Sequence, residues 1–170
     1  MRRLLPLLLA ACAPPGPPAV PAPEPGVWTA AERQTLASLR LDATPRPSPT
    51  NAHADDPDAA ALGQALFFDA GLSPSGEVSC ATCHDPALHF TDGKRLSEGA
   101  GRTRRHAPTI PGSQYGPWFF WDGHADSLWA QAAGPIEADN EMGSDRTFAA
   151  HRILEAHGDA YRAAFGDPPP

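Results

Sequence analysis

Apolar residues recur at helical spacing in several short stretches of this chain, whereas strand-like alternation is scarce. In residues 57–68, Leu62, Leu66 and Phe67 fall on one side of a helix. Asp56 is placed to cap this helix, and Pro57 stands in its first turn. We therefore predict a helix here that turns one apolar side toward a core.

A capping box formed by Thr29 and Glu32 predicts an earlier helix. We expect it to run to about Arg40, with Leu36 and Leu39 facing inward.

Further helices are predicted near the carboxyl end. One runs from about residue 125 to residue 133 and is closed by Gly134-Pro135. Another starts at Ser144 or Asp145 and ends at Gly158, and Asp159 caps a last short helix. Irregular loops join these helices. The longest, residues 89–115, is rich in glycine, proline and basic side chains, which is typical of a loop that lines a site or wraps a cofactor.

The chain has 170 residues, 21 of them proline, and a formal charge of -7. This length fits one all-α domain, which we place at residues 27–170 after a proline-rich linker at residues 13–26. The acidic charge, without a basic tail or basic helix, argues against nucleic acid as a partner.

Residues 1–12 have the features of a lipoprotein-type signal segment. Arg2 and Arg3 precede an apolar run, and small residues stand before Cys12. We expect export to the periplasm or cell envelope, with a lipid anchor at Cys12 as the only attachment to a membrane, because this apolar run is too short to span a bilayer. The alternatives are a plain signal peptide, or an apolar start that follows a misplaced initiator methionine.

The strongest chemical pattern is Cys80-Ala81-Thr82-Cys83-His84, which has the spacing of c-type haem attachment. Over one helical turn the two thiols can reach the vinyl groups of a porphyrin as thioethers, and His84 then lies beneath the iron as its proximal ligand. A thioredoxin-like redox pair would need a βαβ setting, and a structural zinc site would need further Cys or His ligands at short spacing. The sequence has neither, so one covalent haem c is the predicted cofactor.

Beyond this motif, residues 62–142 resemble the bacterial di-haem cytochrome c peroxidases and the related enzymes of the methylamine-utilisation type. The resemblance rests on motifs in the family's order: Leu62 to Asp69, Leu72-Ser73, Ser79 to His84, Thr91-Asp92, Ala107-Pro108-Thr109, Phe120 to Gly123, Gln131 to Glu137, and Glu141-Met142. It implies a cytochrome c-like haem domain with short helices and long irregular loops.

The resemblance also implies roles for three residues outside the haem motif. Glu141 corresponds to the family's distal glutamate, Gln131 to its distal glutamine, and Trp121 to the tryptophan between its two haems. A carboxylate above the iron can move a proton between the two oxygens of hydrogen peroxide, and an amide can hydrogen-bond the oxygen that becomes negative.

The implied activity is that of a cytochrome c peroxidase, which reduces hydrogen peroxide with electrons from a small redox protein such as a cytochrome or a cupredoxin. The acidic net charge would suit a donor with a basic face.

The sequence departs from the family pattern at single positions. Ala100 stands where many members have a loop histidine as the sixth ligand, so we expect a five-coordinate or water-bound iron. His106 stands where an asparagine often helps to bind calcium, which makes a calcium site doubtful. His124 stands where an arginine is frequent.

The family has a second haem domain with its own attachment motif, which this sequence lacks. A separate subunit could supply that haem, an external cytochrome could donate directly on the Trp121 side, or the sequence could be truncated. Two other functions remain open from sequence: a monohaem electron carrier with His84 and Met142 as iron ligands, and an inactive or incomplete half of a two-haem enzyme.

Overall fold

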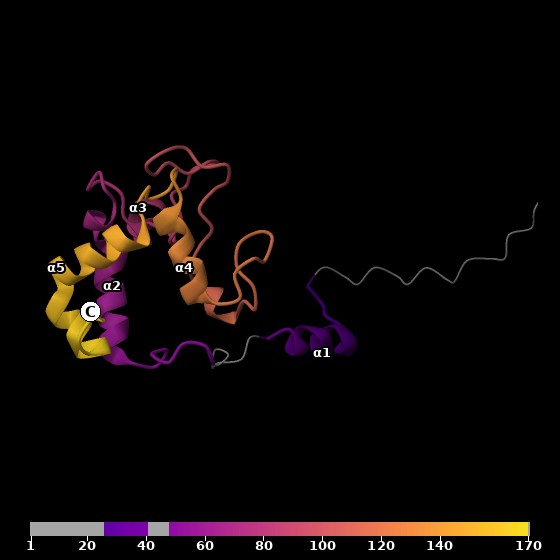
Figure 1. Cartoon of the computed structure of the whole chain (residues 1–170). Coiled ribbons are helices and arrows are strands. Elements are labelled where there is room, and N and C mark those ends of the chain that lie inside the picture. Colours follow the sequence, from indigo (N-terminus) through magenta and orange to yellow (C-terminus); the bar gives the residue numbers. More distant parts are fainter. Residues whose placement is uncertain (1–25, 41–47, 170) are drawn as a thin grey trace, which may run out of the picture. The chain divides into compact units, whose positions relative to one another are not determined.

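The computed structural model describes residues 26–40 and 48–169 (Figure 1). The chain divides into two units, residues 1–41 and residues 42–170. The predicted signal segment, and the proline-rich linker up to residue 25, lie outside the described residues.

The first unit contains α1 (Ala30–Ser38). Its predicted capping box is present, since the Glu32 N–H donates to Thr29 Oγ1 at 3.2 Å and the Thr29 N–H donates to Glu32 Oε2 at 2.7 Å. The expectation that Leu36 and Leu39 face inward is wrong, because they are 46% and 72% exposed. A helix of nine residues has too little apolar surface to make a core of its own.

In the described part of the second unit, residues 48–169, there are four α-helices: α2 (Pro57–Phe68), α3 (Cys80–Cys83), α4 (Leu128–Glu137) and α5 (Arg146–Phe165). Within the described residues there are no strands, only isolated bridges, so the all-α prediction is confirmed. Short 3₁₀ turns interrupt the loops at Ala70–Leu72, Pro86–Leu88 and Ser113–Tyr115. In the part of the chain that the structure describes, no helix has the length and apolar character needed to cross a membrane.

The core lies where α2 packs against α5 and α3, and where α4 also meets α5 (Figure 1). Asp56 caps α2 as predicted, with its Oδ1 accepting from the Asp58 N–H at 2.9 Å, and Leu62 is buried. The centre of the core is Leu72, Val78 and Met142, against which Cys80 packs. The predicted haem motif is therefore fixed directly to the core.

Helix α4 differs from the prediction at both ends. It begins after Ser127, whose hydroxyl accepts from the Ala130 N–H at 3.4 Å, and it continues past Gly134-Pro135 to Glu137. Pro135 lacks only its own N–H, so the next bonds of the helix still form, such as that from the Ala138 N–H to the Gly134 carbonyl at 3.0 Å. The predicted closure at Gly134-Pro135 is therefore wrong.

Helix α5 starts after Asp145, whose Oδ1 accepts from the N–H groups of Thr147 and Phe148 at 2.9 Å each. It is kinked at His157, which has non-helical backbone angles (φ -130°, ψ 22°). The prediction of one helix ending at Gly158 and another starting at Asp159 thus located the break within one residue.

The kink of α5 is tied to the end of α2 by a hydrogen bond between His157 Nε2 and Asp69 Oδ2 at 2.9 Å. This bond lowers the pKa of Asp69 below its ordinary value of 3.8, an effect that burial partly opposes. Because the folded-state pKa is depressed, the pair stabilises the fold above pH ~4, and this contribution is lost as the pH falls through the folded pKa.

We expect Asp69→Asn to lower the free energy of unfolding by about 1–2 kcal/mol at pH 7 and by much less near pH 3. Urea unfolding of the purified protein at both pH values measures this. Asp159→Asn, at a fully exposed carboxylate of α5, should leave the free energy of unfolding unchanged at both pH values. A loss for Asp69→Asn that is equal at the two pH values would contradict the ionic role of Asp69.

Candidate functional site

The Cys80–Cys83 segment forms a single helical turn, α3, and both thiols are free. Burial raises the pKa of the Cys80 thiol and of the Cys83 thiol, and the nearby Asp92 and Glu141 carboxylates raise that of Cys83 further. Reactive cysteine pairs of the thioredoxin type have a thiol with a lowered pKa. The environment of this pair is thus unlike that of a thiol redox site.

His84 follows α3 and is oriented by the loop behind it. Its Nδ1 lies 3.0 Å from the Phe90 carbonyl oxygen, which can only accept, so the proton is on Nδ1 and Nε2 is left free for a metal. The loop closes through the Phe90 N–H, which donates to the Asp85 carbonyl at 2.8 Å. His89 and Phe90 both have positive φ, 56° and 59°, which is a strained conformation for residues other than glycine.

Glu141 is half-buried and held by its backbone. Its carbonyl accepts from the Ala100 N–H at 2.6 Å, and its own N–H donates to the Ala138 carbonyl at 2.9 Å. Gly99 lies so close that a Cβ added there would collide with the Glu141 carbonyl oxygen. The loop around Ala100, where the sequence has alanine instead of the histidine that is the sixth ligand in many relatives, therefore lies directly beside Glu141.

The Glu141 carboxyl group makes no hydrogen bond to any residue that the structure describes. Burial raises its pKa above the ordinary value of 4.5, and a charge on His84 would lower it. Glu141 is thus within electrostatic reach of both His84 and Cys83. A carboxyl group with a raised pKa and no partner is typical of proton-transfer sites.

Gln131 is half-buried on α4. The loop that carries Glu141 folds back onto the end of this same helix, since the Met142 N–H donates to the Pro135 carbonyl at 3.1 Å. Among the described residues no hydrogen bond joins the Gln131 and Glu141 side chains. The two residues are connected through the backbone bond between the Glu141 loop and the end of α4.

Trp121 stands in a tight loop closed by hydrogen bonds between Phe119 and Ala125, and it is 75% exposed. The carbon of the Arg105 guanidinium lies 4.5 Å from the centroid of its ring. This contact was not predicted from sequence, where Arg105 was one of several basic residues in a long loop.

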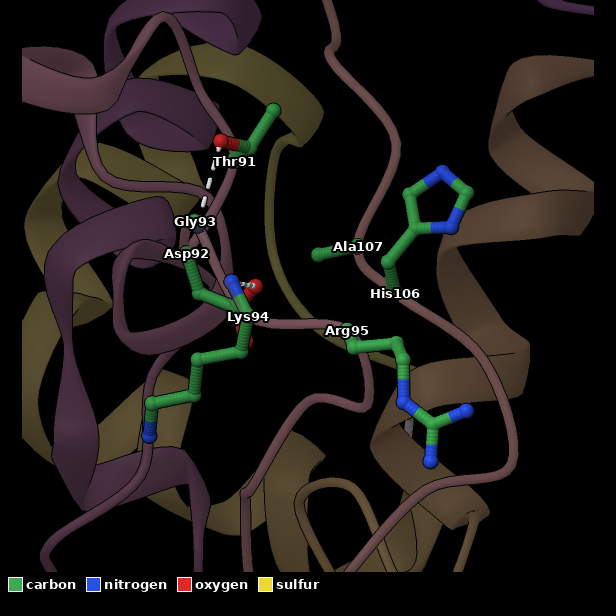
Figure 2. Close-up of a pocket in the computed structure, with 7 residues that line it drawn as sticks. All are labelled: Thr91, Asp92, Gly93, Lys94, Arg95, His106 and Ala107. Carbon is green, nitrogen blue, oxygen red and sulfur yellow. Dashed lines mark hydrogen bonds between the residues drawn. The ribbon is translucent and has the colours of Figure 1, made fainter.

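A pocket of about 380 Å³ lies between residues 91–95, which follow the Phe90 carbonyl directly, and residues 106–107 (Figure 2). Figure 2 shows the side chains of Arg95 and His106 on one side of this pocket and that of Lys94 on the other. Lys94 is paired with Glu98 at 2.8 Å. The pocket lining thus combines the cations Lys94 and Arg95 with the Asp92 carboxylate and His106.

Comparison with known proteins decides which family these features indicate. Residues 57–169 match the model of the family described as di-haem cytochrome c peroxidase. The chain belongs to this family. The resemblance drawn from the short motifs is confirmed.

The methylamine utilization protein MauG of Methylorubrum extorquens is 42% identical to this di-haem peroxidase family member over 149 residues. The match covers 82% of this chain and 41% of that protein. Cytochrome c551 peroxidase of Nitrosomonas europaea is 36% identical over 116 residues, covering 66% of this chain and 35% of that protein. The chain thus spans about two fifths or less of the length of these relatives.

Among solved structures, the diheme peroxidase BthA of Burkholderia thailandensis superposes with a TM-score of 0.61 at 30% identity. The match covers 75% of this chain and 36% of that one. The cytochrome c-type fold predicted from sequence is therefore confirmed.

The chemistry of the site fits the c-type haem of this family. Cys80 and Cys83 are free thiols with the spacing of a haem-binding pair, and the Nε2 of His84 is free to act as a ligand. Sequence reasoning missed the Phe90 carbonyl, which orients His84, and Gly99, which packs against the Glu141 backbone. Gly99 stands next to Ala100, the residue found where many relatives have a loop histidine, whereas a backbone carbonyl leaves no trace in the sequence.

Proposed function

We propose that this chain is a peroxidase-type haem domain that reduces hydrogen peroxide to water with electrons from a small redox protein. The observation that carries this proposal is the Glu141 carboxyl group, which is half-buried, has a raised pKa and is fixed by its backbone within electrostatic reach of His84. An electron carrier has no use for such a group, whereas peroxide cleavage needs one.

In this proposal Cys80 and Cys83 hold one haem c as thioethers, and His84 ligates its iron through Nε2. Arg95 and His106, which line the adjoining pocket, would offer donors for the propionate carboxylates. The bound haem supplies the iron at which the oxygen–oxygen bond is cleaved.

Glu141 would take a proton from one oxygen of the peroxide and return it to the other oxygen, which would leave as water. The Gln131 amide donates a hydrogen bond to the oxygen that gains negative charge. Trp121 conducts electrons between the donor and the haem. Two electrons and two protons convert one hydrogen peroxide into two waters.

The partners in this proposal are a cytochrome or cupredoxin that donates electrons and a second haem domain that lies outside this sequence. We place the protein in the periplasm or cell envelope, with residues 1–12 as a lipoprotein-type signal and Cys12 as a lipid anchor. We propose no calcium site, because His106 stands at the position where an asparagine often helps to bind calcium in the family.

The alternative, an electron carrier with Met142 on the iron, fits the packing less well. Met142 is 3% exposed in the centre of the core, and its carbonyl accepts from the Ser73 hydroxyl at 2.9 Å. Its side chain packs with Leu72 and Val78 in the core, whereas the neighbouring Glu141 is half-buried.

An optical spectrum of the purified, oxidised, haem-loaded protein tests the proposal. We expect a high-spin haem that reacts rapidly with added peroxide. A low-spin spectrum that shows a methionine-to-iron charge-transfer band and is indifferent to peroxide would replace this proposal with the carrier.

We expect Gly99→Ala to slow the peroxide reaction about ten- to a hundredfold, because the new methyl group would displace the Glu141 backbone, and small misplacements of catalytic groups are costly. Stopped-flow absorbance measures the rate. Gly63→Ala on α2 is the matched control, since a Cβ there meets nothing within 4 Å. If both variants react like the unchanged protein, Gly99 does not position Glu141.

A further inference from the structure

Ser73 is a buried serine in the segment that joins α2 to α3. It follows the 3₁₀ turn Ala70–Leu72 and is 2% exposed. Its hydroxyl donates to the Met142 carbonyl at 2.9 Å, across 69 residues of sequence. Met142 is 3% exposed, so this hydrogen bond lies in the core, away from water. A buried hydrogen bond between two such distant segments fixes their relative position.

The proton of the Ser73 hydroxyl is committed to Met142, because a serine has one O–H and a carbonyl oxygen can only accept. Ser73 Oγ also lies 3.0 Å from Ser75 Oγ, so the Ser75 hydroxyl is the donor of this second bond. Ser75 Oγ in turn accepts from the Glu77 N–H at 3.2 Å. The three bonds therefore run in one direction, from the Glu77 backbone to the Met142 carbonyl, and each strengthens the next.

The Ser73 end of this chain of bonds belongs to the part of the core that carries the haem motif. Leu72 and Val78 stand on either side of Ser73 in sequence, and both are members of the central core cluster. Cys80, the first residue of α3, packs against the same cluster. The position of Ser73 is thus tied to that of the Cys80 thiol.

The Met142 end belongs to the turn that carries Glu141. The Met142 carbonyl and the Gly143 N–H are part of one planar peptide unit. The Gly143 N–H donates to the Ala138 carbonyl at 2.9 Å, and the Glu141 N–H donates to the same carbonyl at 2.9 Å. Ser73 therefore holds one side of the peptide unit whose other side closes the Glu141 turn. In the part of the chain that the structure describes, no other side chain hydrogen-bonds to the backbone of Glu141 or Met142.

We propose that Ser73 is a positioning residue for Glu141, whose carboxyl group it holds in place relative to α3 through the bond to Met142. Without the hydroxyl, the Met142 carbonyl would be buried with no donor, which is unfavourable. The peptide unit would tilt toward another donor and displace the Glu141 turn. This role rests on the proposed peroxidase function, in which Glu141 carries the proton and small misplacements are costly.

Hydrogen exchange of the haem-loaded chain tests whether Ser73 holds the Glu141 turn. Ser73→Ala removes the hydroxyl and keeps a small side chain. We expect the amides of Glu141 and Gly143 to exchange about tenfold faster or more in this variant, because the turn opens locally. The His84 amide, which donates to the Cys80 carbonyl at 2.9 Å, should exchange as before. Unchanged exchange in the Glu141 turn would overturn the proposal.

A double-mutant cycle tests whether Ser73 acts on the reaction through Glu141. Ser73→Ala should slow the reaction with peroxide about tenfold in stopped-flow absorbance and leave the haem content unchanged. In a chain that already carries Glu141→Gln, the same substitution should cause no further slowing, since no proton carrier remains to be misplaced. An equal slowing in both backgrounds would show that Ser73 acts elsewhere, and the proposal would fail.

Asp69→Asn is the matched control for a general loss of stability. Asp69 precedes the same 3₁₀ turn, and its bond to His157 supports the fold without contact to the Glu141 turn. Its substitution should leave the peroxide rate unchanged. If Asp69→Asn slowed the reaction as much as Ser73→Ala, the effect of Ser73 would be one of stability, not of position.

The two measurements also separate this inference from the proposed function. If Glu141→Gln alone reacts with peroxide like the unchanged chain, Glu141 is not the proton carrier and the proposed function loses its main support. Hydrogen exchange would still decide whether the Ser73 hydroxyl fixes the Glu141 turn, since that readout does not depend on peroxide.

Discussion

Replacing Glu141 by glutamine is expected to slow the reaction of the haem-loaded protein with hydrogen peroxide by about a hundredfold or more and to leave its haem content unchanged. Glutamine keeps the size and polarity of the side chain but cannot take up and return a proton. Stopped-flow absorbance at several peroxide concentrations gives the rate, and the optical spectrum before mixing shows whether the haem is intact.

Glu137→Gln is the matched control for this substitution. Glu137 lies four residues earlier in the chain, at the end of α4, and its carboxylate is occupied by Arg146 at 2.6 Å. Its loss should leave the peroxide rate unchanged. If Glu141→Gln behaved like this control, Glu141 would not be the proton carrier.

The pH dependence of the same reaction gives a second test of Glu141. A carboxyl group accepts a proton only when it is ionised, and burial raises the pKa of Glu141 above 4.5. The rate should therefore increase with pH through this raised pKa and level off above it. In Glu141→Gln this step in the pH profile should disappear. A step that persists in the variant would belong to another group.

The two helix starts that an aspartate caps were predictable from this sequence, whereas the end of α4 was not. Asp56 and Asp145 cap their helices through side-chain bonds to N–H groups two or three residues ahead, so the signal is local. The end of α4 depends on contacts from elsewhere. The Phe120 ring rests on Gly134, and the Met142 N–H binds the Pro135 carbonyl at 3.1 Å. A prediction from the Gly134-Pro135 pair alone takes no account of these contacts.

The same distinction applies to the candidate site. The spacing of Cys80, Cys83 and His84 is a local pattern and predicted a haem ligand set without any structure. The contacts that fix Glu141 join it to the loop at Gly99 and Ala100, some 40 residues away in sequence. Arg105 reaches Trp121 across a similarly irregular segment. Contacts between long loops have no periodicity, so only the fold reveals them.

Replacing both Cys80 and Cys83 by alanine is expected to abolish covalent haem attachment completely. Each thioether needs one of these sulfurs, and coordination of the iron by His84 does not bond the porphyrin to the chain. Haem staining of a denaturing gel detects covalent haem. The spectrum of the reduced pyridine complex reports how many vinyl groups have been converted into thioethers.

The single variants and His84→Gly separate the two kinds of bond. Cys80→Ala or Cys83→Ala should leave at most one thioether, with the corresponding shift in the pyridine complex. His84→Gly retains both thiols, so any haem that it acquires should remain on the denatured chain, and added imidazole should restore the axial ligand field. Covalent haem in the double variant would show that Cys80 and Cys83 are not the attachment site. Stoichiometric zinc in the unchanged chain would point to a thiolate metal site instead, although the raised pKa values of both thiols oppose their ionisation.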